Sequence, residues 1–281
     1  MSMRRWVGWV LGVVLVVAVV DRAEAQASDA PASSKALAAD AEKDWELELS
    51  PYLWLSMIDG EIDTARFGNR HFKADLGDVM KAFDGGFMGN ASVRWKRFLF
   101  LTDLTWSRLS DRDDVGDSQV RYELEQEIGW LEALAGYRVY QKPGGLLPSS
   151  GASPARSLDV DAFAGLTYTW IDNKLDLRRD PGDVIPAQDR TIRQRDDWTA
   201  PYLALRIRND FTDRLESETF VGVGGFGAGN APEVVWQAYT LLSYGITDHV
   251  RLSAGYRGQG LEKRNVKLNL HGPVLGATIR Y

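Results

Sequence analysis

The densest cluster of side chains that could do chemistry is the acidic stretch DRDDVGD at residues 111–117. Its four aspartates are close enough in sequence to coordinate a calcium ion, which prefers carboxylate oxygens. The EF-hand spacing is not met, because Val115 and Tyr122 stand at the fifth and twelfth positions of the loop. We therefore favour a solvated charged loop and keep calcium binding as the alternative.

The three histidines, His71, His249 and His271, are the other candidates for catalysis. Asp75 follows His71 closely, and a serine on the same strand face as His271 is geometrically possible. Neither spacing defines a nucleophile with its base or a pair of carboxylates. The chain has no cysteine, which excludes a disulfide, a thiol nucleophile and a thiolate metal site. We predict no catalytic residue, no cofactor and no metal site.

The charge balance bears on the class of partner. The sequence has 33 Lys and Arg residues against 39 Asp and Glu residues, a formal net charge of -6. Domains that bind nucleic acid usually carry a basic excess. We therefore predict no nucleic acid partner.

The N-terminal residues predict export. Arg4 and Arg5 precede an unbroken apolar run at residues 6–20, and Ala23 and Ala25 supply the small residues that a signal peptidase reads. The run is shorter than the ~20 residues that a membrane-spanning helix needs, which disfavours a membrane anchor. We predict a signal peptide at residues 1–25, removed by the general secretory route. Residues 26–43, rich in Ala and Ser, are expected to form a flexible lead-in.

The sequence from residue 44 to residue 281 alternates between apolar and polar residues, the period of β-strands. The segment SLDVDAFAGLTYTW at residues 157–170 is the clearest case, with Leu158, Val160 and Leu166 on one face and Asp159 and Asp161 on the other. A slip of one residue would exchange the faces, so the register is strongly specified. Similar runs lie at residues 46–57, 87–95, 98–107, 131–139, 202–208, 220–223, 234–244, 250–257 and 273–281. We predict an antiparallel up-and-down barrel of about ten strands, with eight or twelve as alternatives.

The connections between these strands differ in length by position. The odd-numbered connections, at residues 58–85, 110–118, 173–197, 225–232 and 259–264, are mostly long and charged. The even-numbered ones, at residues 96–97, 209–215 and 246–249, are short, and only 141–156 is longer. Long loops at one end and short turns at the other are typical of transmembrane barrels. The even strand count places both termini at the periplasmic end.

The aromatic residues help to decide which solvent the apolar face meets. Trp95 and Phe98 flank one short turn, Tyr137 and Tyr140 flank another, and Tyr244 precedes a third. Aromatic side chains gather in this way at membrane interfaces. We predict that the apolar face meets lipid. A secreted soluble β-barrel that binds a small apolar ligand is the alternative, since it also alternates.

The C-terminal strand carries a resemblance to a known class. The ending GPVLGATIRY, with apolar residues at alternate positions back from Tyr281, resembles the terminal strand of Gram-negative outer-membrane β-barrel proteins. The tetrapeptide AGYR, at residues 135–138 and 254–257, is frequent in small barrels, and residues 222–260 are similar to a group without known function. The resemblance implies a porin-like protein of the cell outer membrane, in contact with lipid and lipopolysaccharide. It also implies recognition by the barrel-assembly machinery and periplasmic chaperones, through Leu275, Ala277, Ile279 and Tyr281.

Two functions are consistent with such a barrel. It acts either as a narrow pore or as a surface-exposed structural or interaction protein. Outer-membrane enzymes that act on lipid A or on peptides form a further alternative, for which no motif is readable. Charged side chains on the polar face would plug the lumen if they were paired and would line an aqueous path if they were not. The candidate lumen-lining residues are Arg94, Asp103, Glu132, Arg138, Asp161, Arg206 and Arg257.

The apolar phase changes in two segments. Apolar residues occupy even positions in 119–130 and 266–270 but odd positions in the residues after each segment. A β-bulge in each strand would explain the change, and Pro273 fits a bulge because it cannot donate a ladder hydrogen bond. Alternatively, the upper parts of these strands extend above the bilayer. The sequence indicates no oligomeric state.

Overall fold

The computed structural model describes residues 45–64, 68–114, 120–143, 157–179, 188–264 and 266–281. Trp45–Tyr281 form one compact unit. The predicted signal peptide and lead-in lie outside the described residues, as do Asp117 and most of the 141–156 connection. No helix within the described ranges is long and apolar enough to cross a membrane.

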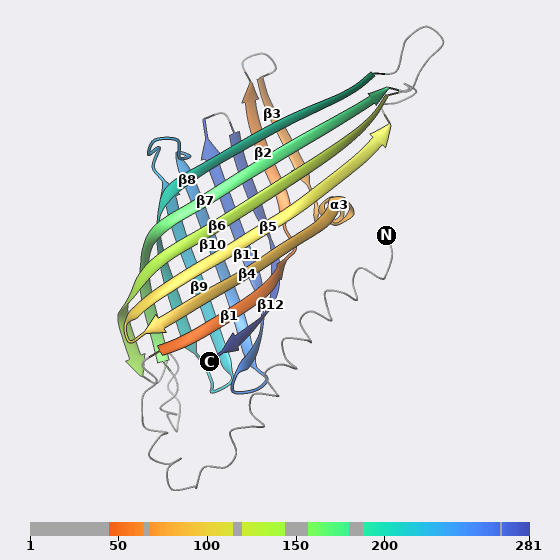
Figure 1. Ribbon diagram of the computed structural model, residues 1–281. Helices are drawn as coiled ribbons and strands as arrows, with labels where there is room; N and C mark the ends of the chain where they lie inside the picture. The colour runs from red at the N-terminus through yellow and green to blue at the C-terminus, as the bar shows by residue number, and fades with distance from the viewer. Residues whose placement is uncertain (1–44, 65–67, 115–119, 144–156, 180–187, 265) are drawn as a thin grey trace. The chain divides into compact units, whose positions relative to one another are not determined.

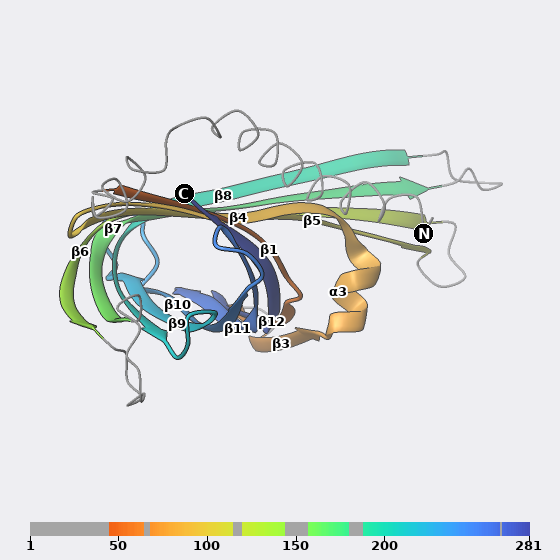
Figure 2. The ribbon, with the colours of Figure 1, turned by 90° about the horizontal axis from the view of Figure 1, so that it is seen from below.

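Ten antiparallel strands close a barrel, and two further strands lie outside it, which confirms the predicted fold class (Figures 1 and 2). Each barrel strand pairs with the next along the chain, and β1 pairs with β12 to close the ring. The barrel strands are β1 (Trp45–Trp54), β4 (Phe83–Trp95), β5 (Phe98–Asp114), β6 (Val120–Pro143), β7 (Ser157–Arg179), β8 (Gln188–Asp210), β9 (Leu215–Gly225), β10 (Val234–Gly245), β11 (Val250–Lys263) and β12 (Val266–Arg280).

The two ends of the described chain meet at the end of the barrel that carries the short turns. Leu47 and Tyr281 exchange two backbone hydrogen bonds, with N···O distances of 3.2 and 2.9 Å. Trp45 pairs with Trp95, next to the turn in which Lys96 adopts a positive φ of 56°. The short connections therefore lie at one end of the barrel and the long connections at the other.

The first long connection is not the loop that the sequence predicts. Residues 58–85 contain most of a hairpin, β2 (Met57–Thr64) and β3 (Gly68–Ala74), followed by a short helix, α3 (Leu76–Ala82). β2 continues the register of β1 against β12, since Trp54 faces Val274 and Met57 faces His271. The ladder is interrupted opposite Pro273, which lacks an N–H but accepts a hydrogen bond from the Leu55 N–H at 3.0 Å.

Of the two explanations for the change of apolar phase, the bulges are wrong. β6 pairs with β5 without a shift from Arg121 to Tyr137, and β12 pairs with β11 without a shift from Val266 to Ile279. Register shifts occur elsewhere, between Phe83 and Gly85 and between Arg138 and Tyr140. Since an unshifted ladder keeps each residue on its face, Ile128, Trp130, Leu268 and Leu270 lie on the inner face, where all four are buried.

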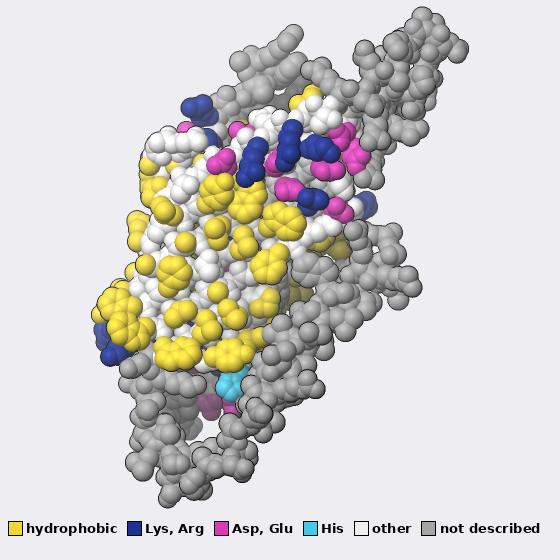
Figure 3. Space-filling view, in the orientation of Figure 1, with side chains coloured by type: hydrophobic (Ala, Val, Ile, Leu, Met, Phe, Trp, Pro, Cys, Tyr) yellow, Lys and Arg dark blue, Asp and Glu magenta, His cyan; other side chains and the backbone are white. Residues whose placement is uncertain are grey.

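The outer face of the barrel carries a band of exposed apolar side chains (Figure 3). Aromatic residues gather at its margins: Phe98 packs against Trp95 and Tyr137 at the lower margin, and Tyr168 stacks on Trp170 at the upper one. Charged side chains lie above the band. The exposed apolar side chains of the band include Leu49, Leu53, Val93, Phe100, Leu131, Leu166, Leu203, Leu205, Val221, Leu252 and Leu275.

The upper parts of β5 to β8 project beyond the other strands (Figure 1). We call these parts the overhang: residues 107–114, 120–128, 171–179 and 188–199. Most of the predicted loops at 110–118 and 173–197 is therefore strand. In the overhang the faces are reversed, with Ile128 buried inside and Arg108 and Glu127 paired on the outer face.

We expect a charge in the middle of the apolar band to be costly. Leu203, which is 53% exposed, lies within the band, whereas Thr199 lies beside Tyr168 at its upper margin. Leu203→Arg should lower the free energy of unfolding in lipid vesicles by about 2–4 kcal/mol, and Thr199→Arg by about 0–1 kcal/mol, because the cost falls toward the interface. Urea titrations followed by tryptophan fluorescence measure both values. Equal, small losses would mean that this face does not meet lipid.

Candidate functional site: the paired charges of the barrel interior

The predicted lumen-lining residues all lie on the inner face of the sheet. Six of them are almost completely buried, with at most 6% of each residue exposed. Arg94 is the seventh, and it lies near the short-turn end, where its side chain is 27% exposed and binds Glu46 at 2.9 Å. The six buried residues are Asp103, Glu132, Arg138, Asp161, Arg206 and Arg257.

Asp161 is the most enclosed of these charges. Its carboxylate accepts a hydrogen bond from Arg138 Nε at 2.8 Å and another from Arg206 Nη2 at 2.9 Å. Arg138 also binds Asp159 at 2.8 Å, and Arg206 lies over the ring of Phe163. The three strands β6, β7 and β8 place these groups side by side, since Asp161 faces Arg138 on one side and Arg206 on the other.

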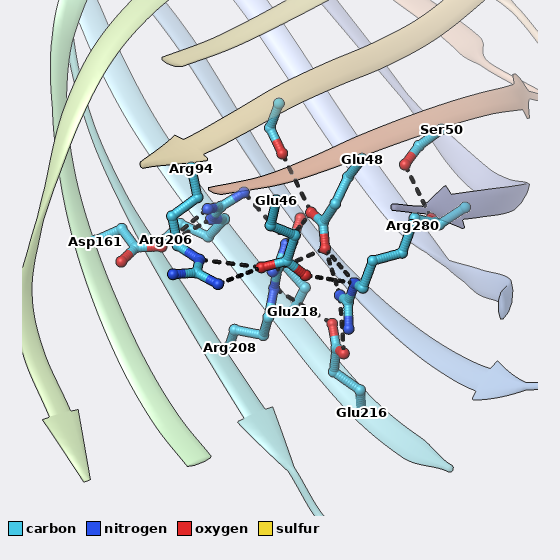
Figure 4. A network of polar contacts seen from close by, with 12 residues as sticks. Glu46, Glu48, Ser50, Arg94, Asp161, Arg206, Arg208, Glu216, Glu218 and Arg280 are labelled. Carbon is cyan, nitrogen blue, oxygen red and sulfur yellow. Dashed lines mark hydrogen bonds and ion pairs between the residues drawn. The ribbon is translucent and has the colours of Figure 1, made fainter. Parts of the chain in front are cut away.

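A second group surrounds Glu48 and crosses the barrel (Figure 4). The Glu48 carboxylate accepts hydrogen bonds from Arg208 Nη2 at 2.8 Å and from Arg280 Nε at 2.7 Å. Arg208 also binds Glu218 at 2.8 Å, and Arg280 lies 3.4 Å from Glu216. Because β1, β8, β9 and β12 each contribute, these ion pairs connect opposite walls of the interior.

Arg257 organises a further layer. Its Nη2 donates to Asp103 at 2.9 Å, to Gln237 at 2.9 Å and to Gln259 at 3.0 Å. Tyr52 donates its hydroxyl hydrogen to the same Asp103 carboxylate at 2.9 Å. A guanidinium has five N–H donors and no acceptor, so this arrangement uses it as the centre of a polar network.

Glu132 differs from the other buried carboxylates. It faces Asp103 on one neighbouring strand and Thr167 on the other, and only 1% of the residue is exposed. No Lys or Arg of the described chain lies within ion-pair distance of it. Burial of a carboxylate without a cation is unfavourable. Glu132 therefore serves as an internal comparison for Asp161.

Apolar side chains fill the interior toward the overhang. They form one packed cluster that includes three tryptophans. The described part of the chain leaves a cavity of about 70 Å³ below it, among Glu48, Arg208, Tyr52 and Arg257. A water molecule needs roughly 10–15 Å³ of such space, so the cavity has room for only a few waters. The members of the apolar cluster include Trp54, Trp130, Trp198, Val235, Leu261, Leu268 and Leu270.

Several interior residues were missed by the sequence analysis. Tyr52 occupies an even-numbered position, like Glu46 and Glu48, so the alternation of the strand indicates that it lies on the same face as they do. Trp130 and Ile128 were not identified as interior residues, because the change of apolar phase in 119–130 left both a bulge and an extension above the bilayer as explanations. The partner of a charge on a distant strand, such as Arg208 for Glu48, carried no signal, because that pairing depends on the closure of the ring.

The histidines do not form the arrangements considered from sequence. His71 lies on β3 near Asp59 and Glu61, at 3.8 and 3.7 Å, and Asp75 instead caps α3. His271 contacts the hydroxyl of Tyr256 at 2.7 Å rather than a serine of the lumen. The described residues contain no group of three or more His, Cys, Asp or Glu side chains that could hold a metal ion.

The outer face of the overhang carries ion pairs of its own. Arg193 donates to Asp172 at 2.7 and 3.0 Å, and these hydrogen bonds hold the pKa of Asp172 below its ordinary value. Lys174 binds Asp176 at 2.8 Å, and this hydrogen bond raises the pKa of the lysine. The charges on this face are therefore largely paired with one another.

No family model matches the chain, and neither does any curated protein. Solved structures that it resembles include the outer membrane protease OmpT from Escherichia coli, with 8% identity, a TM-score of 0.46, and coverage of 86% of this chain and 97% of OmpT. The translocator domain of the autotransporter NalP from Neisseria meningitidis has 12% identity, a TM-score of 0.32, and coverage of 94% and 98%. Ail, the attachment invasion locus protein of Yersinia pestis, bound to sucrose octasulfate, has 9% identity, a TM-score of 0.35, and coverage of 84% and 98%. All are Gram-negative outer-membrane β-barrels, but likeness at this level carries no argument about function.

We expect Asp161 and Glu132 to respond oppositely to neutralisation. Asp161→Asn should lower the free energy of unfolding by about 3–5 kcal/mol, because two buried arginines lose their carboxylate. Glu132→Gln should leave it unchanged or raise it, since a neutral amide is easier to bury than a carboxylate. Urea unfolding in lipid vesicles gives both values. Equal losses in the two variants would show that ion pairing does not distinguish the sites.

Proposed function

We propose that this protein is an integral outer-membrane β-barrel with a closed lumen, and that it acts as a structural or interaction protein of the cell surface. The pairing of its buried charges is the observation that carries the proposal. Asp161 joins two arginines, and Glu48 joins Arg280 on the neighbouring strand to Arg208 on the opposite wall of the barrel. Side chains bound in this way fill the interior, whereas an aqueous path needs charges that remain hydrated.

The outer face supports the membrane location. Leu203, Leu205 and Val221 are each more than half exposed, and all point away from the interior. A soluble barrel turns its apolar face inward, and this unit leaves an apolar band outside. The cost of hydrating such a band favours lipid as its solvent.

The orientation follows from the two ends of the barrel. We propose that the short turns and both chain ends face the periplasm, and that the overhang faces the exterior, where lipopolysaccharide surrounds it. Leu275 and Tyr281 are exposed on the outer face of the last strand. With Ala277 and Ile279 they are proposed to form the signal that the assembly machinery and its chaperones recognise.

A narrow pore remains the second candidate, favoured by the polar cavity. That cavity holds five arginines and four carboxylates in its walls, but these charges are largely paired with one another. An enzymatic role has no supporting arrangement of side chains among the described residues. We therefore propose that the overhang provides the surface for the structural or interaction role.

Conductance distinguishes a closed lumen from a pore. The refolded mature protein, first shown to migrate as a heat-modifiable band, should give no steady stepwise conductance in a planar bilayer. The double variant Asp161→Ala with Arg206→Ala removes a neutral pair from the interior and is the matched comparison. Conductance in this variant alone would assign the barrier to the ion-pair layer. Steady steps from the unaltered protein would contradict the closed lumen, and failure to insert would contradict the membrane location.

A further inference from the structure

The short-turn end of the barrel carries a group of exposed cations on one side. Lys96, Arg97 and Lys142 are all exposed, and we call them the cationic patch. The sequence segments that contain them, 85–102 and 133–158, have no Asp or Glu. On the outer face of the overhang, by contrast, cations are paired with carboxylates. The patch is therefore a local excess of positive charge in a chain whose formal net charge is -6.

The cationic patch lies against aromatic rings. Trp95 faces Phe98, and Phe98 faces Tyr137, with ring centroids 6.2 and 5.5 Å apart. Lys96 Nζ lies 5.6 Å from the centroid of the Trp95 ring, a position in which the ring attracts the ammonium. In Figure 3, Lys or Arg side chains lie beside the lower left edge of the apolar band. The patch thus marks the lower margin of that band.

A β-bulge directs Lys142 to the same outer surface. The ladder between β6 and β7 shifts between Arg138 and Tyr140, which leaves Val139 as the extra residue. Arg138 points inward, whereas Tyr140 is 50% exposed, and Lys142 lies two residues further along the outer face. The Arg138 N–H donates to the Arg97 carbonyl at 2.8 Å, so the bulge adjoins the turn that carries the other two cations. Bulges are often found where a strand must re-aim a side chain.

The chemistry of the patch and its surroundings matches an anionic phospholipid. Lys and Arg bind phosphate oxygens through charge-assisted hydrogen bonds. Directly above the patch, Val93 and Phe100 are 41% and 53% exposed and belong to the apolar band. A molecule that contacts both surfaces needs a phosphate at one end and a hydrocarbon chain that runs along the band.

We propose that Lys96, Arg97 and Lys142 bind the head group of an anionic phospholipid whose acyl chains lie against the apolar band. The inference rests on the proposed membrane location, and it names the lipid that contacts the short-turn end. A phospholipid with net negative charge is favoured over a zwitterionic one, because basic residues at a membrane surface attract anionic lipids. The rings of Trp95 and Phe98 contact the region between the head group and the chains.

Three other occupants fit the patch less well. A second copy docked through the same surface by a two-fold axis would set cations against cations. An acidic segment of a soluble protein would satisfy the charges, but beside the band its backbone groups would enter lipid, where unpaired polar groups are costly. Inorganic phosphate satisfies the charges and makes no use of the rings.

The test measures lipid preference beside the patch. The chain has no cysteine, so Ala135→Cys, at an exposed position on β6 just above Tyr137, carries a single bimane label. The full mature chain is refolded in phosphatidylcholine vesicles that contain a small fraction of dibrominated phosphatidylglycerol or dibrominated phosphatidylcholine, both of which quench the label on contact. We expect the brominated phosphatidylglycerol to associate about fivefold or more strongly. The preference should fall as salt is added, because salt screens exposed charges.

A second label position tests whether the preference is local. Ala254→Cys is an exposed position on β11, which is five strands from β6 in the ten-strand ring. The two brominated lipids should quench a label there about equally, since the patch is on the other side of the barrel. Equal preference for the anionic lipid at both labels would contradict a site and indicate general attraction to the surface.

Two triple variants separate the patch from the overall charge. The patch variant carries Lys96→Gln, Arg97→Gln and Lys142→Gln. The matched variant removes the same charge from exposed residues at the long-connection end, through Arg195→Gln, Arg264→Gln and Lys267→Gln. The patch variant should lower the preference at the Ala135→Cys label to about one, and the matched variant should leave it unchanged. Heat-modifiable migration shows whether each variant is folded.

The remaining outcomes overturn the proposal. Equal quenching by both lipids at the Ala135→Cys label, or a preference that the patch variant retains, contradicts the lipid site. Loss of the preference in inorganic phosphate, but not in chloride of the same ionic strength, assigns the cations to a free anion. A dimer in light scattering that the patch variant abolishes assigns the surface to a second copy. If neither lipid quenches either label, the proposed membrane location itself fails, and the closed lumen is judged separately by conductance.

Discussion

The barrel depends on one constraint, the register of its antiparallel ladder, which shifts at two places among the described strand pairs. The side-chain period of a strand is two, so between these shifts the register assigns each residue to the outer face or to the interior. β7 shows this in its central part, with Asp161 and Thr167 buried on one face and Leu166 exposed on the other. The same ladder continues into the overhang, where the solvent changes and the chemistry of the two faces changes with it.

The register turns many polar side chains toward the interior. These side chains are removed from bulk water, and each needs a hydrogen-bond or ion-pair partner. Asp161, Glu48 and Asp103 find theirs on neighbouring or opposite strands, in hydrogen bonds of 2.7–2.9 Å. Above them the apolar cluster includes Trp54, Trp130 and Trp198, whose indole N–H groups are buried without a hydrogen-bond partner among the described residues. The interior thus resembles the core of a soluble protein, with ion pairs toward the short turns and tryptophans toward the overhang.

Much of the fold was predictable from sequence, because alternation is a local signal. The strand at residues 157–170, the short turn at 96–97 and the closed barrel of about ten strands are confirmed. Bulges near residues 130 and 273 were one explanation for the change of apolar phase, and the structure contains neither. The other explanation, that the upper part of the strand projects beyond the rest, agrees with the overhang for β6. Trp130 shows the difference: it is 4% exposed and faces inward, at the level where Tyr168 and Trp170 form the upper margin of the apolar band on the outer face. Pairing between distant strands, such as Glu48 with Arg208, has no local signal at all.

The hydrogen bonds between Leu47 and Tyr281 have a consequence for the order of assembly. They join residues at opposite ends of the unit, so the ring closes only after its last strand is available. Until then β1 and the newest strand both present free edges, and each is open to wrong pairing. Contacts of such long sequence separation also form slowly. Until the final strand pairs with β1 the sheet is unclosed, and that pairing converts it into a barrel.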